Sequence, residues 1–208
     1  MPEETGWFVP TIQFGKEDVF LFEDWEETPV GPYRAVFHFN PDDFRTLYAS
    51  TPEGGDFVSS VHRFDEKNVV EVKSRRNGGR WTIEADTGDK GPLKIEIDYR
   101  ETGLLKLVNP IAAYTPKAIA RNALYCRLLP RIAGPMLGID SDQKIAAETE
   151  MGRKGCFQMY RIYRVIAATC TWGDRDMGPL EDCCYDHDIG GFKLTTKPII
   201  SYLTLYLD

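Results

Sequence analysis

The densest group of side chains that could perform chemistry lies near the C-terminus, in residues 181–188, which read EDCCYDHD. A carboxylate beside a histidine fixes the tautomer of the imidazole and raises its basicity, so His187 with Asp186 or Asp188 is a candidate pair for acid–base catalysis. The alternative is a solvated loop in which a neighbouring carboxylate merely holds His187. Asp, His and Cys are also metal ligands, but the spacing matches no known metal cage, and we predict no metal site.

A second candidate site follows from the strand pattern around Arg161. Side chains alternate between the two faces of a strand, which places Arg161 on the same face as Phe157, Met159, Tyr163 and Val165. A guanidinium in apolar surroundings must meet a carboxylate or bind an anion, because burying an isolated charge is costly. Arg161 is therefore either half of a structural ion pair or, together with Tyr163, part of a ligand-binding site.

Two histidines, His38 and His62, fall on predicted strands, on the faces away from most of the large apolar residues. Both are surface residues unless the sheet encloses a cavity, in which case both can line it beside Arg34. Polar groups that converge among aromatic side chains are typical of small-molecule pockets. The candidate ligand-binding residues are Arg161, Tyr163, His62, His38 and Arg34.

Segments of alternating apolar and polar residues predict the strands that would carry these side chains. The clearest hairpin joins residues 69–75 to 81–85, because Asn77-Gly78 supplies the positive φ values of a tight turn. Residues 173–191 form a long Gly- and Asp-rich connection, and such loops are often functional. The predicted strands are 7–14, 18–25, 33–39, 57–64, 69–75, 81–85, 93–100, 145–151, 156–168 and 199–207.

The stretch from Thr102 to Ile139 is predicted to be helical, and it carries basic residues but no acidic one. Thr115-Pro116 is a helix start signal, and Pro130 is expected to kink or end the helix. Residues 116–131 then form an amphipathic helix with an apolar back. Its basic face either is solvated and pairs with acidic strands, or meets an anionic ligand, a membrane surface or an acidic partner. This face consists of Lys117, Arg121, Arg127 and Arg131.

These elements predict an α+β fold, made mainly of antiparallel β-sheet that curls into a barrel-like or two-layer arrangement, with one central helical insertion at about residues 102–139. The chain has 208 residues, of which 42% are hydrophobic and 27% are charged, as is ordinary for a globular protein. Single β-rich domains commonly reach this length, so we predict one domain, residues 1–208.

Several functional classes lose support from the sequence. The net charge of −7 disfavours nucleic-acid binding, which needs clustered Lys and Arg. No GxGxxG, Walker, HExxH or GxSxG motif occurs, and we predict no cofactor. No run of about 18 apolar residues is present, which argues against a transmembrane helix. Five cysteines without a CxxC pair, and an acidic N-terminal segment without an apolar signal core, favour a reduced cytoplasmic location.

The leading hypothesis is a soluble β-barrel-like domain that binds a small, largely apolar ligand, which can also carry an acidic group. In this hypothesis Arg161 and Tyr163 lie inside the barrel, and His62 or His38 lies near its mouth. The oligomeric state is left open by the sequence.

Two alternatives come from other classes. The first is a cofactor-free acid–base enzyme of the isomerase, cyclase or decarboxylase type on the same scaffold, using His187 with Asp186 or Asp188. The second is a peripheral membrane or partner-binding module that uses the basic helix, residues 116–131. An enclosed cavity would support ligand binding or catalysis, whereas a filled core with an exposed basic stripe would support the docking module.

Overall fold

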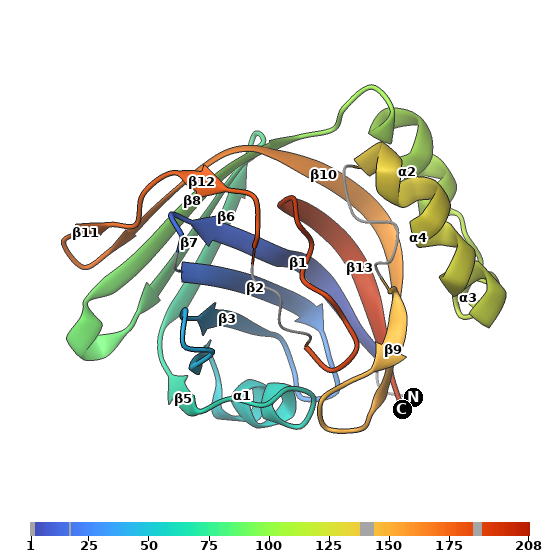
Figure 1. The fold of residues 1–208 in the computed structure, drawn as a ribbon. Coiled ribbons are helices and arrows are strands. Elements are labelled where there is room, and N and C mark those ends of the chain that lie inside the picture. The colour runs from blue at the N-terminus through green and yellow to red at the C-terminus, as the bar shows by residue number, and fades with distance from the viewer. Residues whose placement is uncertain (1–2, 17, 138–143, 185–188) are drawn as a thin grey trace.

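The computed structural model of the protein describes residues 3–16, 18–137, 144–184 and 189–208, which form one large curled sheet with helices at its margins (Figure 1). The strands are β1 (Glu3–Phe14), β2 (Asp18–Glu27), β3 (Tyr33–Phe39), β4 (Arg45–Ala49), β5 (Glu66–Val69), β6 (Val72–Asn77), β7 (Arg80–Asp86), β8 (Pro92–Arg100), β9 (Ala146–Glu148), β10 (Lys154–Trp172), β11 (Arg175–Asp176), β12 (Leu180–Glu181) and β13 (Ile199–Leu207). The helices are α1 (Pro52–Ser59), α2 (Leu105–Ala113), α3 (Lys117–Ala120) and α4 (Ala123–Leu137), with a 3-10 turn at Gly88–Lys90.

The strands follow one another across the sheet in the order β5-β4-β3-β2-β1-β13-β10-β8-β7-β6, while β9 and β11 pair with β10, and β12 pairs with β1. Among the described strands, every pairing is antiparallel except that of β4 with β5. Helices α2–α4 are inserted between β8 and β9. The predicted α+β class, with a curled antiparallel sheet and a helical insertion, is therefore confirmed.

One hydrophobic core forms where the sheet curls and brings β6–β8 against β1–β3. Phe22 of β2 packs edge-on against Trp81 of β7, with their ring centroids 5.1 Å apart. Val36 of β3 and Ile95 of β8 belong to the same buried cluster. Strands that are far apart in the order of the sheet thus pack into one core. Alternate residues of each strand point to the side of this core, and they supply its apolar side chains.

A second hydrophobic core lies on the other face of β1–β4 and β13. Leu21 and Trp25 of β2, Phe37 of β3 and Leu203 of β13 are buried in it. Helix α1 and the segment that contains Ile189 cover part of this face. The alternation along β2 explains the division, because Phe20 and Phe22 face the first core, and Leu21 and Trp25 face the second.

An asparagine on α2 completes the free edge of β10. The side-chain oxygen of Asn109 accepts a hydrogen bond from the Ile162 N–H at 3.0 Å, and its Nδ2 donates to the Ile162 carbonyl, also at 3.0 Å. The same Nδ2 lies 2.7 Å from a Glu101 carboxylate oxygen. The Asn109 amide therefore substitutes for a neighbouring strand, and it fixes α2 against the sheet.

Two predicted elements are wrong. Residues 57–64 do not form a strand: α1 begins after Thr51, whose hydroxyl accepts a hydrogen bond from the Gly54 N–H at 3.0 Å. The predicted single helix from Thr115 is instead divided into α3 and α4, and the Thr115 hydroxyl donates to the Ile111 carbonyl of the preceding helix. Helix α4 also continues past Pro130. None of the described helices is both long and apolar enough to cross a membrane.

Candidate functional site

A cavity of about 220 Å³ lies between the face of the sheet that carries the second core, the helices α2–α4 and the segment 189–195. Its walls are mainly aliphatic and aromatic, as is typical of sites for small organic molecules. The apolar side chains that line it include Phe8, Leu21, Phe157, Met159, Leu203 and Leu205 from the sheet, Leu105, Val108 and Leu129 from the helices, and Ile189 and Leu194 from the segment.

Glu23 contributes a buried carboxyl group to the wall of this cavity. The alternation of β2 places it between Leu21 and Trp25 on the second-core face. Burial raises the pKa of Glu23 well above its ordinary value, and the nearby Glu4 carboxyl raises it further. The Trp25 indole N–H lowers it, but this N–H makes no hydrogen bond of ordinary geometry within the described residues. Burial therefore favours the protonated form of Glu23, which can donate a hydrogen bond.

Glu4 and Tyr33 form a second layer behind Glu23. The Tyr33 hydroxyl donates to a Glu4 carboxylate oxygen at 2.7 Å, and both side chains are buried. Burial raises the pKa of Glu4 to about 7, against the opposing effects of the Tyr33 hydrogen bond and the positive charge of Arg153. Because the Glu4 charge raises the pKa of Glu23, the two carboxyl groups titrate as a pair.

Two more polar atoms of the lining are available for hydrogen bonding. The Thr195 hydroxyl is buried, and it has no hydrogen-bond partner among the described residues, although the Thr195 N–H donates to the Thr11 hydroxyl at 2.9 Å. His62 Nδ1 is also buried without a partner of hydrogen-bond geometry, since the nearest Glu150 oxygen is 3.8 Å away. A ligand that enters the cavity can form hydrogen bonds with these two groups, which have no hydrogen-bond partner among the described residues.

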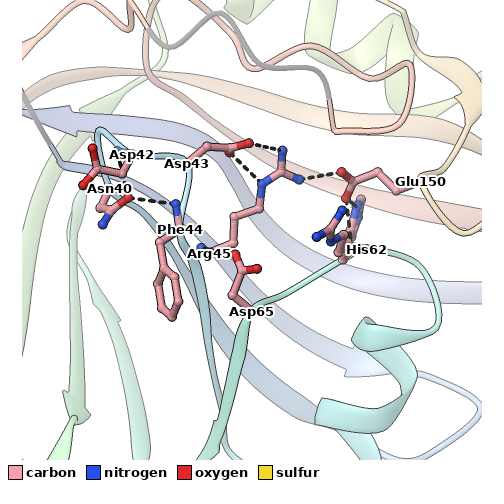
Figure 2. A network of polar contacts seen from close by, with 9 residues as sticks. Asn40, Asp42, Asp43, Phe44, Arg45, His62, Asp65 and Glu150 are labelled. Atoms are coloured by element: carbon pink, nitrogen blue, oxygen red, sulfur yellow. Dashed lines mark hydrogen bonds and ion pairs between the residues drawn. The ribbon is translucent and has the colours of Figure 1, made fainter.

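A polar network holds the histidine side of the cavity (Figure 2). Arg45 donates to Asp43 at 2.9 Å and to Glu150 at 2.5 Å. The other Glu150 oxygen accepts the Arg63 N–H at 3.0 Å. Burial alone would raise the pKa of Glu150, but contacts with His62, the Arg63 N–H and Arg45 hold it below its ordinary value. Glu150 is therefore a charged anchor that joins the β3–β4 turn and the residues after α1 to the β9–β10 turn.

Of the five predicted ligand-binding residues, only His62 lines the cavity. Arg161 is exposed, because a register shift between Met159 and Arg161 interrupts the predicted alternation of β10. The prediction that Arg161 shares a face with Met159 is therefore wrong. Tyr163 packs in the first core instead, with its ring 5.9 Å from that of Trp7.

His38 and Arg34 also lie away from the cavity. His38 is buried on the side of the sheet that carries the first core, and its Nε2 is 2.7 Å from an Asp18 carboxylate oxygen. Arg34 forms an ion pair with Asp24 at 3.0 Å. Neither His38 nor His62 is a surface residue of an open strand. The structure does not bring the five predicted ligand-binding residues together. Their ligand-binding roles remain predictions.

The predicted acid–base residues Asp186, His187 and Asp188 lie outside the described residues. Glu23 was missed by the sequence analysis, although the sequence carries a usable signal for it. Val19, Leu21 and Trp25 share its strand face, so a carboxylate interrupts an apolar stripe.

Comparisons with known proteins give fold-level likenesses alone. No protein-family model matches the chain, and no curated protein matches it in sequence. A solved structure of acetoacetate decarboxylase from Legionella pneumophila subsp. pneumophila str. Philadelphia 1 is 8% identical, with a TM-score of 0.47 over 99% of this chain and 84% of that one. Another structure, from structural studies of acetoacetate decarboxylase, is 11% identical, with a TM-score of 0.48 over 100% of this chain and 86% of the other.

Proposed function

We propose that the protein binds a small, largely apolar molecule that carries a hydrogen-bond acceptor, such as a carbonyl oxygen, in the cavity beneath α2–α4. The observation that supports this proposal is Glu23, a buried carboxyl group in the wall of a 220 Å³ apolar cavity, where burial raises its pKa and favours its protonated form. A buried carboxyl is costly to stability unless it is satisfied. Residues that lower stability without serving the core are often retained for function.

The size of the cavity limits the ligand. An apolar cavity of about 150 Å³ is large enough for benzene. The volume of about 220 Å³ therefore suits a single ring with a short side chain, or a short branched chain. The protonated Glu23 would donate to the acceptor, and the Thr195 hydroxyl is a second polar group for the same ligand.

An acidic ligand is compatible with this arrangement. A neutral Glu23 donates to a carboxylate oxygen as well as to a carbonyl oxygen. Lys144 and Lys193 are exposed members of the lining, and their ammonium groups would attract the acidic end of a ligand at the solvent side of the cavity.

The second candidate function is acid–base catalysis on a bound carbonyl compound. It is favoured by the pKa of about 7 for Glu4 next to the raised pKa of Glu23, because such groups exchange protons near neutral pH. In this proposal Glu23 touches the substrate, and Glu4 is a positioning residue that adjusts its protonation. In this second proposal the acid–base role falls to Glu23 in the wall of the cavity, and the role of His187 stays a prediction.

The test compares two probes of the same shape, benzylacetone and butylbenzene, which differ by a carbonyl in place of a methylene. Both should raise the melting temperature of the parent protein, and benzylacetone should bind about fivefold more tightly, as one net hydrogen bond provides. Glu23→Leu should remain folded and bind both probes equally. Glu27→Leu, which alters an exposed carboxylate on the same strand, should retain the preference for the ketone.

Two outcomes contradict the proposal. If neither probe raises the melting temperature of the parent protein or of Glu23→Leu, the cavity is not a site for molecules of this class. If Glu23→Leu keeps the full preference for benzylacetone, the acceptor is recognised by another group. Catalysis is tested separately by following exchange of the ketone's α-hydrogens with deuterated water, which Glu23→Leu should abolish.

A further inference from the structure

The outer surface of the helices α2–α4 exposes an unusual concentration of large apolar side chains. Leu107, Ile111 and Tyr114 are 70%, 72% and 87% exposed. On α4, Leu124 and Ile132 are 63% and 67% exposed. Seven of the twelve exposed large hydrophobic residues among the described residues belong to these helices and their junctions, so the exposure is localised rather than scattered.

These side chains form stripes along the helices. Leu107 and Ile111 are four residues apart on α2, and Tyr114 follows three residues later, which places them on one side. Leu124, Leu128 and Ile132 recur every four residues along α4 and likewise share one side. Leu128 and Ile132 also line a shallow groove with Ile119 of α3, so the apolar surface continues from α4 to α3. The helices stand as one layer beside β10 (Figure 1).

Basic side chains accompany the apolar stripes. Arg127 and Arg131 lie within about 60° of Leu124 around the axis of α4, and both are exposed. Lys106 is exposed on α2. These three cations have no ion-pair partner among the described residues. The stretch 102–139 contains five basic residues and no acidic one, in a chain whose net charge is −7.

The other two basic residues of the predicted basic face are held within the protein. Lys117 forms an ion pair with Glu3, and its ammonium lies 4.8 Å from the ring centre of Tyr206. Arg121 lies 5.4 Å from the centre of the same ring. The cations that can serve an external partner are therefore Lys106, Arg127 and Arg131, a set that differs from the one expected from the sequence.

We infer that the outer surface of α2–α4 docks on an anionic lipid bilayer. Apolar side chains can enter the boundary between headgroups and acyl chains, and flanking Lys and Arg pair with anionic headgroups. Tyrosine is enriched at that boundary, which suits the almost fully exposed Tyr114. A second copy of the chain suits this surface less well, because face-to-face pairing would bring two sets of unpaired cations together. The inference does not rest on the proposed ligand.

Flotation of the full chain with lipid vesicles tests the inference. The protein should float with vesicles of phosphatidylcholine and phosphatidylglycerol, and raising the salt concentration should release it. It should not float with phosphatidylcholine alone. Arg127→Gln with Arg131→Gln should weaken binding about thirtyfold, as expected for the loss of two headgroup contacts.

A second variant examines the apolar part of the surface. Ile111→Ser, Leu124→Ser and Ile132→Ser together should weaken vesicle binding by more than about tenfold. The control is Val69→Ser with Ile166→Ser, which alters two exposed large apolar side chains outside α2–α4 and should bind like the parent. All of these residues are exposed, so every variant should melt near the parent temperature.

Three results would overturn the inference. The first is no flotation of the parent protein with anionic vesicles at low salt. The second is binding that both the charge variant and the serine variant retain. The third is a dimer of the parent in sedimentation that only the serine variant dissociates, because this would assign the surface to a second copy of the chain.

Discussion

Between pH 4.5 and pH 7, the protein should lose about 3 kcal/mol of unfolding free energy because of Glu4. The pKa of this carboxyl is raised from 4.5 in the unfolded chain to about 7 in the folded protein. The folded state therefore binds the proton more tightly. This contribution is fully present below the unfolded pKa and is lost as the pH rises through the folded pKa, so stability falls toward neutral pH. Glu23 acts in the same direction, because its pKa is also raised.

Glu4→Gln should remove the part of this pH dependence that Glu4 contributes. The Gln side-chain oxygen can still accept the hydrogen bond from Tyr33, so the loss is confined to the titrating proton. Urea unfolding at several pH values gives the difference in unfolding free energy between the parent and the variant. The contributions of other carboxyl groups, such as Glu150, whose pKa is lowered, cancel in this difference. Glu27→Gln, an exposed change, is the control. Equal slopes of stability against pH for parent and Glu4→Gln would show that Glu4 is not buried in the folded protein.

Asn109→Leu should destabilise the protein by about 2–6 kcal/mol, the largest effect that we expect from a single substitution of an uncharged residue. Leucine has the same branched arrangement of side-chain heavy atoms, but it leaves both the N–H and the carbonyl of Ile162 without the partners that Asn109 supplies. A buried backbone group without a partner costs about 1–3 kcal/mol. Because Asn109 also holds α2 against β10, the cavity probes should bind more weakly even at temperatures where the variant is folded.

A graded series separates this role from simple packing. Asn109→Asp keeps an acceptor for the Ile162 N–H, but it places a buried carboxylate oxygen against the Glu101 carboxylate and the Ile162 carbonyl. Its stability should therefore be no higher than that of Asn109→Leu at neutral pH, and it should recover part of the loss at acid pH, where the carboxyl groups are protonated. Asn68→Leu, at a partly exposed asparagine of β5, should change stability by no more than about 0.5 kcal/mol. A loss below about 1 kcal/mol for Asn109→Leu would indicate that α2 can separate from β10 without cost.

Strands were predicted well where one face of the strand is apolar and the other is polar. Residues 199–207 were predicted as a strand and form β13, and the hairpin around Asn77-Gly78 joins β6 to β7 as expected. Local alternation and turn chemistry determine these elements, so the sequence contains the necessary information.

Helix starts were predicted less well, because the same local signal occurs at two places. Thr51-Pro52 and Thr115-Pro116 are both a capping residue followed by proline, yet only Thr51 caps a helix in the structure. Glycines at positions 54 and 55 are poor helix formers, so local propensity argues against the first helix. One of them lies so close to Tyr33 that a Cβ there would be only 2.6 Å from the ring, so close packing accounts for glycine at this position. Tertiary contacts, not local propensity, decide between the two sites.

The candidate site was harder to predict than the fold. A charged group on an apolar strand face is expected to mark a site, but a register shift in β10 defeats this expectation for Arg161. It holds for Glu23, whose strand β2 shows no shift in this region in its pairing with β3. Glu4 becomes relevant only through its neighbours Tyr33 and Glu23, which lie 29 and 19 residues away in sequence. Neither the register shift in β10 nor the long-range contacts of Glu4 can be predicted from the local pattern of a single sequence.

The central pair of strands in the sheet, β1 and β13, comes from opposite ends of the described chain, and β13 alone joins β1 to β10. Until residues 199–207 have left the ribosome, β1 and β10 must each wait with an unpaired edge. Closing a sheet through such distant partners is slow, because chain entropy is lost before the contacts form. Open edges also recruit strands of other chains. We therefore expect newly made chains to depend on chaperones during synthesis, and truncation before β13 to yield aggregates rather than a smaller folded domain.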